Sequence, residues 1–399
     1  MEQTTVSPSQ QTAIPPDITP VPKPARQQVE FSTVCYRNEI PEFVEREMER
    51  LYESIYSTVA FYKIYGAGHE GMSTYVVWRN EKIITVFLFR MENGKVTVFN
   101  HMVNIRHAEI ERFSAYIFST LEQVAVIIFK AVGIVRRRLP FPCQQYQCTE
   151  DIVLKLPDSE SAYLASLGRS TRKTVRGYIN KTMRNHPSFR YDVYERGDVD
   201  EKHIRDIIGF NRARMASKYK ESAIDEAEAE RIIKLVRQYG LVGVATIDGT
   251  VCAGSISCCI GSHYFMLVSA HDATYDALRM GLLCCYLSIC DCIARGGREC
   301  HFLCGRYDNK YMLQGVQRSL DCMVIYRSRA RMLLHAGTAL KAAFSAILFQ
   351  ARMWLLYNGN NQKSFFFRVA GKLLLRVRKQ RRNRAASSAP AAQPEQTGS

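Results

Sequence analysis

The chain has 399 residues, 47% of them hydrophobic and 23% charged, and its 54 basic and 38 acidic side chains give a net charge of +16. This composition is typical of a globular protein, and the chain is long enough to form two domains and a sizeable hydrophobic core. Because no stretch of about 18 residues is both apolar and uncharged, we expect no membrane-spanning helix. The positive charge favours a phosphate-bearing partner, such as nucleic acid or anionic lipid, although many basic proteins have none.

The two ends of the chain have compositions that disfavour a core. Residues 1–30 are rich in Pro, Gln, Thr and Ser, and residues 381–399 are similarly polar, so both segments are predicted to be disordered. The N-terminal segment contains no apolar stretch of the kind found in secretory leaders. Together with 13 cysteines, several of them within apolar segments, this predicts a cytoplasmic protein with reduced thiols.

The first half of the chain begins with an amphipathic pattern, in which Val44, Met48, Leu51 and Ile55 recur at helical spacing. Turn residues and apolar runs then predict a series of strands and one long helix. In chain order the predicted elements are a helix at Glu42–Tyr56, strands at Ser73–Arg79, Lys82–Met91 and Gly94–Asn100, a helix at Ala108–Val132 and a strand at Glu150–Leu156.

The second half repeats this order after a basic helix and two further helices. Its first elements are a helix at Ser159–Asn185, a strand at Phe189–Tyr194, and helices at Asp200–Ser217 and Asp225–Tyr239. Strands at Leu241–Ile247, Val251–Ile260 and His263–Ala270 precede a helix that opens at Met280-Gly281, and then come a strand at Cys300–Cys304, a helix at Lys310–Gln317 and a strand at Cys322–Arg327. Helix patterns continue at Arg329–Tyr357 and Phe365–Arg378.

Three antiparallel strands, a helix entered through Arg-x-Gly, a strand, a helix and a strand resemble the layout of acyltransferases of the GNAT type. The resemblance implies an α/β fold with tandem GNAT-like domains, each a mixed, mostly antiparallel sheet flanked by helices. We therefore expect a disordered segment (1–30), an N-terminal domain (31–157), a C-terminal domain (158–330), C-terminal helices (331–380) and a disordered tail (381–399).

An acyl-CoA donor needs backbone N–H groups at a helix N-terminus for its pyrophosphate and an open strand edge for its pantetheine arm. The segment Arg279-Met280-Gly281-Leu282 offers a cation, a glycine and a helix start. Val268 and Ser269, within the strand segment Phe265–Ser269, offer the edge, provided that this strand parts from Cys300–Cys304. In the alternative interpretation, Arg279 is a solvated loop residue and Gly281 only allows close packing.

Three polar residues near the predicted strand ends are candidates for acid–base chemistry. His271 or Asp272 would remove a proton from an acceptor amine, and Lys310 would orient acceptor or donor phosphate. In the alternative interpretation, Asp272 caps a turn and His271 is an exposed side chain. We expect no metal at Cys300-His301-x-x-Cys304, because the spacing is wrong for a two-cysteine knuckle and a matching second pair is missing.

The basic helix is a separate signal. Its cations at Arg172, Lys173, Arg176, Lys181 and Arg184 indicate either a phosphate- or polyanion-binding surface or simply a solvated basic face.

The order of several motifs resembles the CelD-like branch of the GNAT superfamily, bacterial acyltransferases related to the FemAB peptidyltransferases. The motifs are Leu-Gly-x-Ser-Thr-Arg-Lys-x-x-Arg at 167–176, the turn Asp248-Gly249, the loop at 272–283 and Gly-x-Tyr-x-x-Lys at 305–310. The resemblance implies that the second domain binds acyl-CoA. The sequence departs from the family pattern at His301, where the family has Asp, and at Asn309, where it has Tyr, while Lys310 matches.

These observations leave three hypotheses. The first is an N-acyltransferase that moves an acetyl or other acyl group from acyl-CoA to an amine, such as an amino sugar of envelope or exopolysaccharide synthesis. The second is a FemAB-type transferase that uses aminoacyl-tRNA, which the charge of +16 and the basic helix favour. The third is a non-catalytic protein at the inner face of the membrane, because the aromatic and basic residues of 365–384 are suited to anionic lipid.

Overall fold

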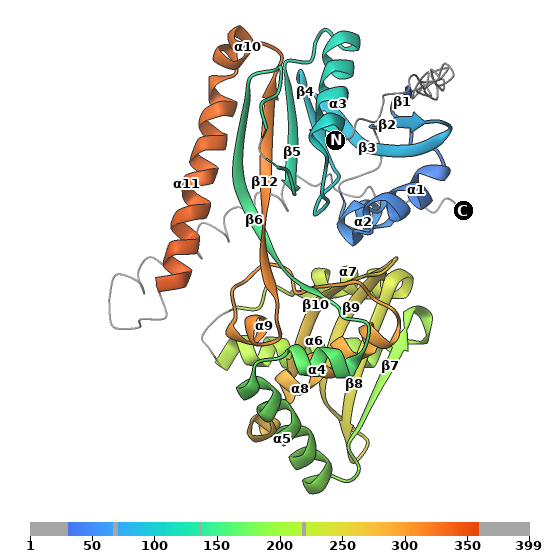
Figure 1. The fold of residues 1–399 in the computed structure, drawn as a ribbon, viewed down its shortest axis with the longest axis vertical. Helices are drawn as coiled ribbons and strands as arrows, with labels where there is room; N and C mark the ends of the chain where they lie inside the picture. Colours follow the sequence, from blue (N-terminus) through green and yellow to red (C-terminus); the bar gives the residue numbers. More distant parts are fainter. Residues whose placement is uncertain (1–30, 67–70, 136, 218–220, 359–399) are drawn as a thin grey trace, which may run out of the picture.

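The computed structural model describes residues 31–66, 71–135, 137–217 and 221–358. Their strands form one twelve-stranded sheet in the order β1-β2-β3-β4-β5-β12-β6-β11-β10-β9-β8-β7. The molecule has two lobes, one above the other in Figure 1, and the long strands β6 (Cys143–Lys155) and β12 (Val316–Tyr326) run from one lobe to the other.

The first lobe is built from a meander of antiparallel strands closed by a parallel one. It contains β1 (Phe31–Tyr36), β2 (Met72–Arg79), β3 (Lys82–Glu92), β4 (Lys95–Val98) and β5 (Val126–Val132), with α1 (Phe43–Tyr52), α2 (Val59–Ile64) and α3 (His107–Thr120). The β2–β3 hairpin turns at Asn80 and Glu81, which both have positive φ, as a two-residue hairpin turn requires. Phe113 of α3 packs edge-on against Phe87 and Phe129 in a fully buried core.

The second lobe has the same order of elements. It contains α4 (Glu160–Ser166), α5 (Arg169–Asn185), β7 (Arg190–Glu195), α6 (Glu201–Ser217), α7 (Glu226–Tyr239), β8 (Gly240–Ile247), β9 (Thr250–Ile260), β10 (His263–His271), α8 (Met280–Ala294), β11 (Glu299–His301) and α9 (Asp308–Met312). The β8–β9 turn at Asp248 and Gly249 again has positive φ at both residues. After β12 the chain returns along the first lobe as α10 (Arg329–Leu334) and α11 (Ala336–Asn358), which lies beside β6 (Figure 1).

The two halves exchange their last strands. β6, which ends the first half, pairs with β11 of the second lobe, whereas β12, which ends the second half, lies between β5 and β6. The predicted fold class is confirmed: the sheet is mixed and mostly antiparallel, helices flank it, and the order of elements is repeated. The predicted domain division remains a prediction, and the exchange ties the two parts together through backbone hydrogen bonds.

Some predicted elements were wrong. The helix at Ala108–Val132 ends at Thr120, and Val126–Val132 is β5. Residues 126 and 127 are both fully buried although their side chains point to opposite faces of the sheet, so the sequence lacks the alternation that marks a half-buried strand.

The boundaries of other predicted elements differ from those in the structure. The helix at Ser159–Asn185 is divided into α4 and α5, because Leu167 and Gly168 are extended. The helix predicted at Lys310–Gln317 is the shorter α9, and β12 starts at Val316. Strand β1 and helix α2 were not predicted. The disorder predicted for 1–30 and 381–399 and the helix at Phe365–Arg378 lie outside the described residues. Within the described ranges no helix has the length and apolar character needed to cross a bilayer.

Candidate functional site

An open strand edge lies where β10 and β11 part. The two strands pair in parallel only from His263↔Glu299 to Phe265↔His301. β11 ends at His301, whereas β10 continues to His271 after a bulge between Met266 and Val268. Among the described residues, no strand pairs with the rest of β10 on this side. The backbone N–H and C=O groups of this segment are therefore available to an extended ligand.

The N-terminus of α8 lies just beyond the end of this edge. A 3₁₀ helix, Ala273–Leu278, leads into Arg279, which has a left-handed backbone (φ 49°) and precedes the first residue of α8. The carbonyl of Arg279 accepts from the N–H groups of Leu282 and Leu283 at 3.0 and 3.2 Å. The N–H groups of Met280 and Gly281 belong to the first turn, where an α-helix provides no acceptor of its own. This end of the helix therefore presents donors and a partial positive charge.

The basic helix α5 packs against this helix end. The ring of Tyr178 has the Lys181 ammonium 5.8 Å and the Arg279 guanidinium 5.9 Å from its centroid. Lys181 Nζ also donates to the carbonyl of Ala277 at 3.2 Å. Two cations therefore flank the N-terminus of α8, and the basic helix and the Arg-x-Gly loop, which are separate signals in the sequence, lie in one place.

His271 and Gly281 are in direct contact. The His271 Nε2 atom lies 2.7 Å from Asp276 Oδ1, and the other side of the ring faces Gly281, where an added Cβ would lie 2.8 Å from His271 Nδ1. A side chain at 281 would therefore displace the imidazole. Asp272 accepts the N–H of Thr274 at 2.9 Å, so its carboxylate caps the turn, as the alternative interpretation expects.

Val268 and Ser269 lie within the open segment of β10 and have different surroundings. Val268 is buried in the core beneath α6 and α7, whereas the Ser269 hydroxyl lies 3.1 Å from the thiol of Cys285 on α8. At both positions the backbone, and not the side chain, faces the open strand edge.

Lys310 is tied to the loop that follows β11. Its ammonium donates to the carbonyls of Phe302, Leu303 and Cys304 at 2.6, 3.2 and 2.9 Å. Burial lowers the pKa of this ammonium. The loop contains a left-handed residue, Leu303 (φ 60°), and Lys310 holds it in a shape that ends β11 early.

The cations of α5 differ in their exposure. Arg172 turns back on the chain and donates to the carbonyls of Ala165 and Leu167, whereas Lys173, Arg176 and Arg184 are exposed. The exposed set lies on the same helix as Lys181.

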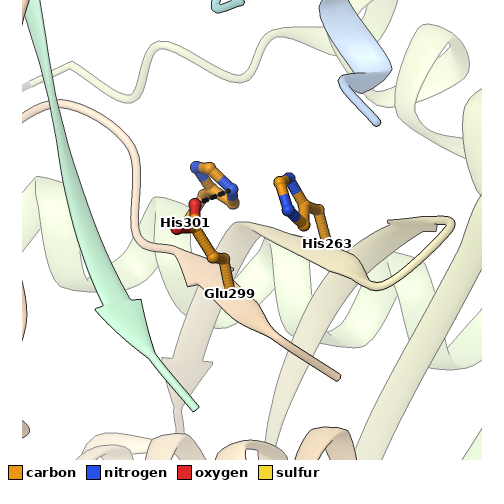
Figure 2. Close-up of side chains that lie close together, drawn as sticks. All are labelled: His263, Glu299 and His301. Carbon is orange, nitrogen blue, oxygen red and sulfur yellow. Dashed lines mark ion pairs between the residues drawn. The ribbon is translucent and has the colours of Figure 1, made fainter. Parts of the chain in front are cut away.

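A second polar cluster, which sequence reasoning missed, lies where β10 and β11 pair. Figure 2 shows His263, Glu299 and His301 turned toward one another. The His301 ring stacks on Phe265 with centroids 4.3 Å apart, and its Nδ1 lies 2.6 Å from Asp151 Oδ2. Asp151 belongs to β6, so it reaches this place only through the strand exchange, which no local pattern reveals.

Residues 169–311 match the model of the Acetyltransferase (GNAT) domain. This part of the chain, which contains β7 to β11 and α5 to α8, is similar to a GNAT acetyltransferase domain, and that match supports an acyltransferase. A search of curated proteins found no match.

Solved structures give a fold-level likeness. The crystal structure of FemX is 9% identical, with a TM-score of 0.53, over 72% of this chain and 96% of that one. A tandem GNAT protein from the clavulanic acid biosynthesis pathway is 11% identical, with a TM-score of 0.35, over 74% of this chain and 98% of that one. L-PGS from Bacillus licheniformis is 12% identical, with a TM-score of 0.38, over 62% and 82%. The FemX likeness shows a shared fold alone, and the CelD-like subtype stays a prediction.

Proposed function

We propose that the protein is an N-acyltransferase that moves an acetyl or other acyl group from acyl-CoA to an amine. The observation that carries this proposal is the convergence of the open β10 edge with the basic N-terminus of α8. The edge suits the amide-containing pantetheine arm, and Arg279, Lys181 and the N–H groups of Met280 and Gly281 suit the pyrophosphate. The acyl-CoA is a co-substrate, and the residues present fit both of its polar parts.

The proposed reaction is a direct transfer. The amine nitrogen attacks the thioester carbonyl carbon, the C–S bond breaks, and CoA leaves as a thiolate that takes up a proton. From the bulge residue Leu267 to His271 the strand spans about 13 Å at 3.3 Å per residue. With the pyrophosphate at α8, we expect the thioester to lie near the bulge, where a backbone N–H would stabilise the oxyanion of the tetrahedral intermediate.

The proton of the attacking amine needs a base. Of the two candidates, His271 is the stronger, because Asp276 orients its ring, whereas the Asp272 carboxylate already holds the turn. Because about 13 Å of strand separates His271 from an amine at the bulge, a chain of several water molecules would have to connect them. Lys310 acts in this scheme as a positioning residue that keeps β11 short and the edge open.

The acceptor class that we propose is an amino sugar of envelope or exopolysaccharide synthesis, in line with the CelD-like motif order. Turnover of acetyl-CoA and longer acyl-CoAs with a panel of amines, including amino sugars, tests the proposal. Binding at a hundred times the dissociation constant should raise the free energy of unfolding by about 2.7 kcal/mol. If no acyl-CoA of any chain length binds the folded protein, the proposal is wrong.

A second candidate function is transfer from aminoacyl-tRNA. The observation that favours it is the set of exposed cations, Lys173, Arg176 and Arg184, on the helix α5 that packs against the proposed donor site. A tRNA affinity that falls steeply with salt, and that a triple change of these residues to Gln weakens, would support it. Absent or salt-independent binding would exclude it.

A third candidate is peripheral contact with the inner face of an anionic membrane. α11 exposes large apolar side chains along one side, with Leu340 69%, Phe344 59%, Ile347 63% and Trp354 60% exposed. The basic and aromatic segment 365–384 that would accompany it lies outside the described residues. Binding to vesicles rich in phosphatidylserine should be lost when Phe344, Ile347 and Trp354 are changed to Ser; unchanged binding would refute the contact.

A further inference from the structure

The strand register determines which side chains meet in the polar cluster where β10 and β11 pair. His263 pairs with Glu299 and Phe265 with His301, so His263, Glu299 and His301 point to the same face of the sheet. β6 places Val153 opposite His301, which puts Asp151, two residues earlier, on that face as well. Four potential ligand-forming side chains from three strands therefore meet on one face. Figure 2 shows three of them, His263, Glu299 and His301.

The contacts within the cluster leave one nitrogen without a partner. His301 Nδ1 donates to Asp151, because a carboxylate only accepts. His301 Nε2 then faces Glu299 Oε2 at 3.6 Å, beyond hydrogen-bond range, and is a buried atom without a hydrogen bond among the described residues. The His301 side chain is only 8% exposed, so bulk solvent has little access to this nitrogen.

We propose that His263, Glu299 and His301 bind one divalent transition-metal ion, with Asp151 orienting His301 from behind. One ligand atom from each of the three lies within 4.8 Å of those of the other two. Tetrahedral bonds of 2.0–2.2 Å would place these atoms about 3.4 Å apart, so side-chain rotations alone bring them into range. Two imidazoles and one carboxylate suit Zn²⁺ or Fe²⁺ and do not suit Mg²⁺ or Ca²⁺, which prefer oxygen.

The surroundings match those of a metal site. A ligand histidine generally donates its other N–H to a carboxylate, which is what His301 does toward Asp151. Arg318 binds both oxygens of Glu299 at 2.6 and 2.7 Å, and this orients the carboxylate while leaving further lone pairs.

The charges around the cluster nearly balance when both histidines are neutral. Glu53, Asp151 and Glu299 supply three negative charges. Arg298 pairs with Glu53, Arg318 pairs with Glu299, and Lys310 interacts electrostatically with Asp151. The competing arrangement is an imidazolium at His301 between Asp151 and Glu299.

Metal binding by the full-length protein distinguishes the two arrangements without reference to acyl transfer. Protein without an affinity tag, stripped with a chelator, is titrated with Zn²⁺ by calorimetry and with Co²⁺ by visible absorption. We expect one equivalent of each to bind, with the d–d bands of a four- or five-coordinate Co²⁺ ion, and no binding of Mg²⁺. Asp151→Asn should weaken binding about tenfold to hundredfold.

Variants of the proposed ligands and matched controls test whether the metal binds at this cluster. His263→Gln and His301→Gln should each abolish the bound equivalent, whereas His271→Gln, which changes a histidine paired with Asp276, and Cys304→Ser should keep it. His263 is only partly buried, and thermal unfolding of its Gln variant establishes that the protein is folded. If the folded wild type binds no Zn²⁺ or Co²⁺, or if His263→Gln and His301→Gln leave binding unchanged, the imidazolium arrangement holds and the metal site does not exist.

Discussion

The two halves of the chain have the same order of elements but differ at the place where a donor would bind. In the second half the pairing of β10 and β11 stops at Phe265↔His301. In the first half β4 and β5 pair from Lys95↔Val126 to Thr97↔Ile128. The segments that follow these two strands then pair again in parallel. Gly133 donates to Val103 and accepts from Ile105 at 2.8 and 3.0 Å, which closes the edge.

The N-termini of α3 and α8 also differ, because one is occupied and the other is open. At the start of α3 the backbone N–H of Arg106 donates to the carboxylate of Glu109 at 3.1 Å, and Glu109 is buried. The protein's own anion therefore occupies the end of α3, where it stabilises the helix and would repel phosphate. Arg279 at the start of α8 corresponds to Arg106 at the start of α3, but the first turn of α8 contains no acid that corresponds to Glu109. The comparison teaches that the order of elements sets the fold, whereas an open edge and an uncapped helix end set the candidate site.

The largest effect is expected from removing the cation at the open helix end. Arg279→Gln should weaken acetyl-CoA binding about tenfold to hundredfold, because a charge-assisted bond to phosphate contributes about 1.5–3 kcal/mol. The matched change at the closed helix end, Arg106→Gln, should leave the affinity unaltered. Calorimetric titration of both variants decides this, and equal losses would show that the two helix ends do not differ.

A smaller effect is expected from adding one methyl group at the contact between β10 and α8. In Gly281→Ala the new Cβ would lie 2.8 Å from His271 Nδ1, so the imidazole must shift and its contact with Asp276 is disturbed. We expect kcat to fall about tenfold if His271 is the base.

The control for this change is Gly177→Ala on α5, where a Cβ meets no atom within 4 Å. It should raise the free energy of unfolding by about 0.5–1 kcal/mol and leave kcat unchanged. A Gly281→Ala enzyme with the wild-type kcat would remove His271 from the proposed mechanism.

The smallest effect is expected at the closed helix end. Burial raises the pKa of Glu109, which the Arg106 N–H and nearby arginines only partly oppose. The folded state therefore holds this proton to higher pH than the unfolded state does, and wild-type stability falls as pH rises from 4.5 through the raised pKa.

Glu109→Gln removes this titration, so its Tm relative to the wild type should rise by a few degrees across that pH window. Acetyl-CoA affinity should stay the same, since α3 has no part in the donor site. A constant difference in Tm from pH 4 to pH 7 would contradict the assigned titration.

The sequence predicted those parts of the molecule that depend on local signals. The hairpins at Asn80-Glu81 and Asp248-Gly249 were recognisable because their turns need residues that tolerate positive φ between apolar runs. β5 was mistaken for helix because it is buried on both faces. The Arg279-x-Gly281 loop was recognisable as a helix start, but its approach to Lys181 was not, because the two positions are far apart in the chain.

The polar cluster could not be predicted for a similar reason. Asp151 and His301 are 150 residues apart and meet only because β6 crosses to the second lobe. The sequence drew attention to His301 through the cysteines around it, yet Cys300 points into the opposite core and Cys304 is exposed. Alternation along β11 separates the thiols from the imidazole.

The central claim is that acyl-CoA binds to the second half of the chain and not to the first. Amide hydrogen exchange of the protein with and without saturating acetyl-CoA tests it most directly. We predict slower exchange in Leu267–His271 and Met280–Leu282 on binding, with no change in the corresponding segment of the first half, residues 97–109. Protection of residues 97–109, or of neither segment while acetyl-CoA demonstrably binds, would contradict this account.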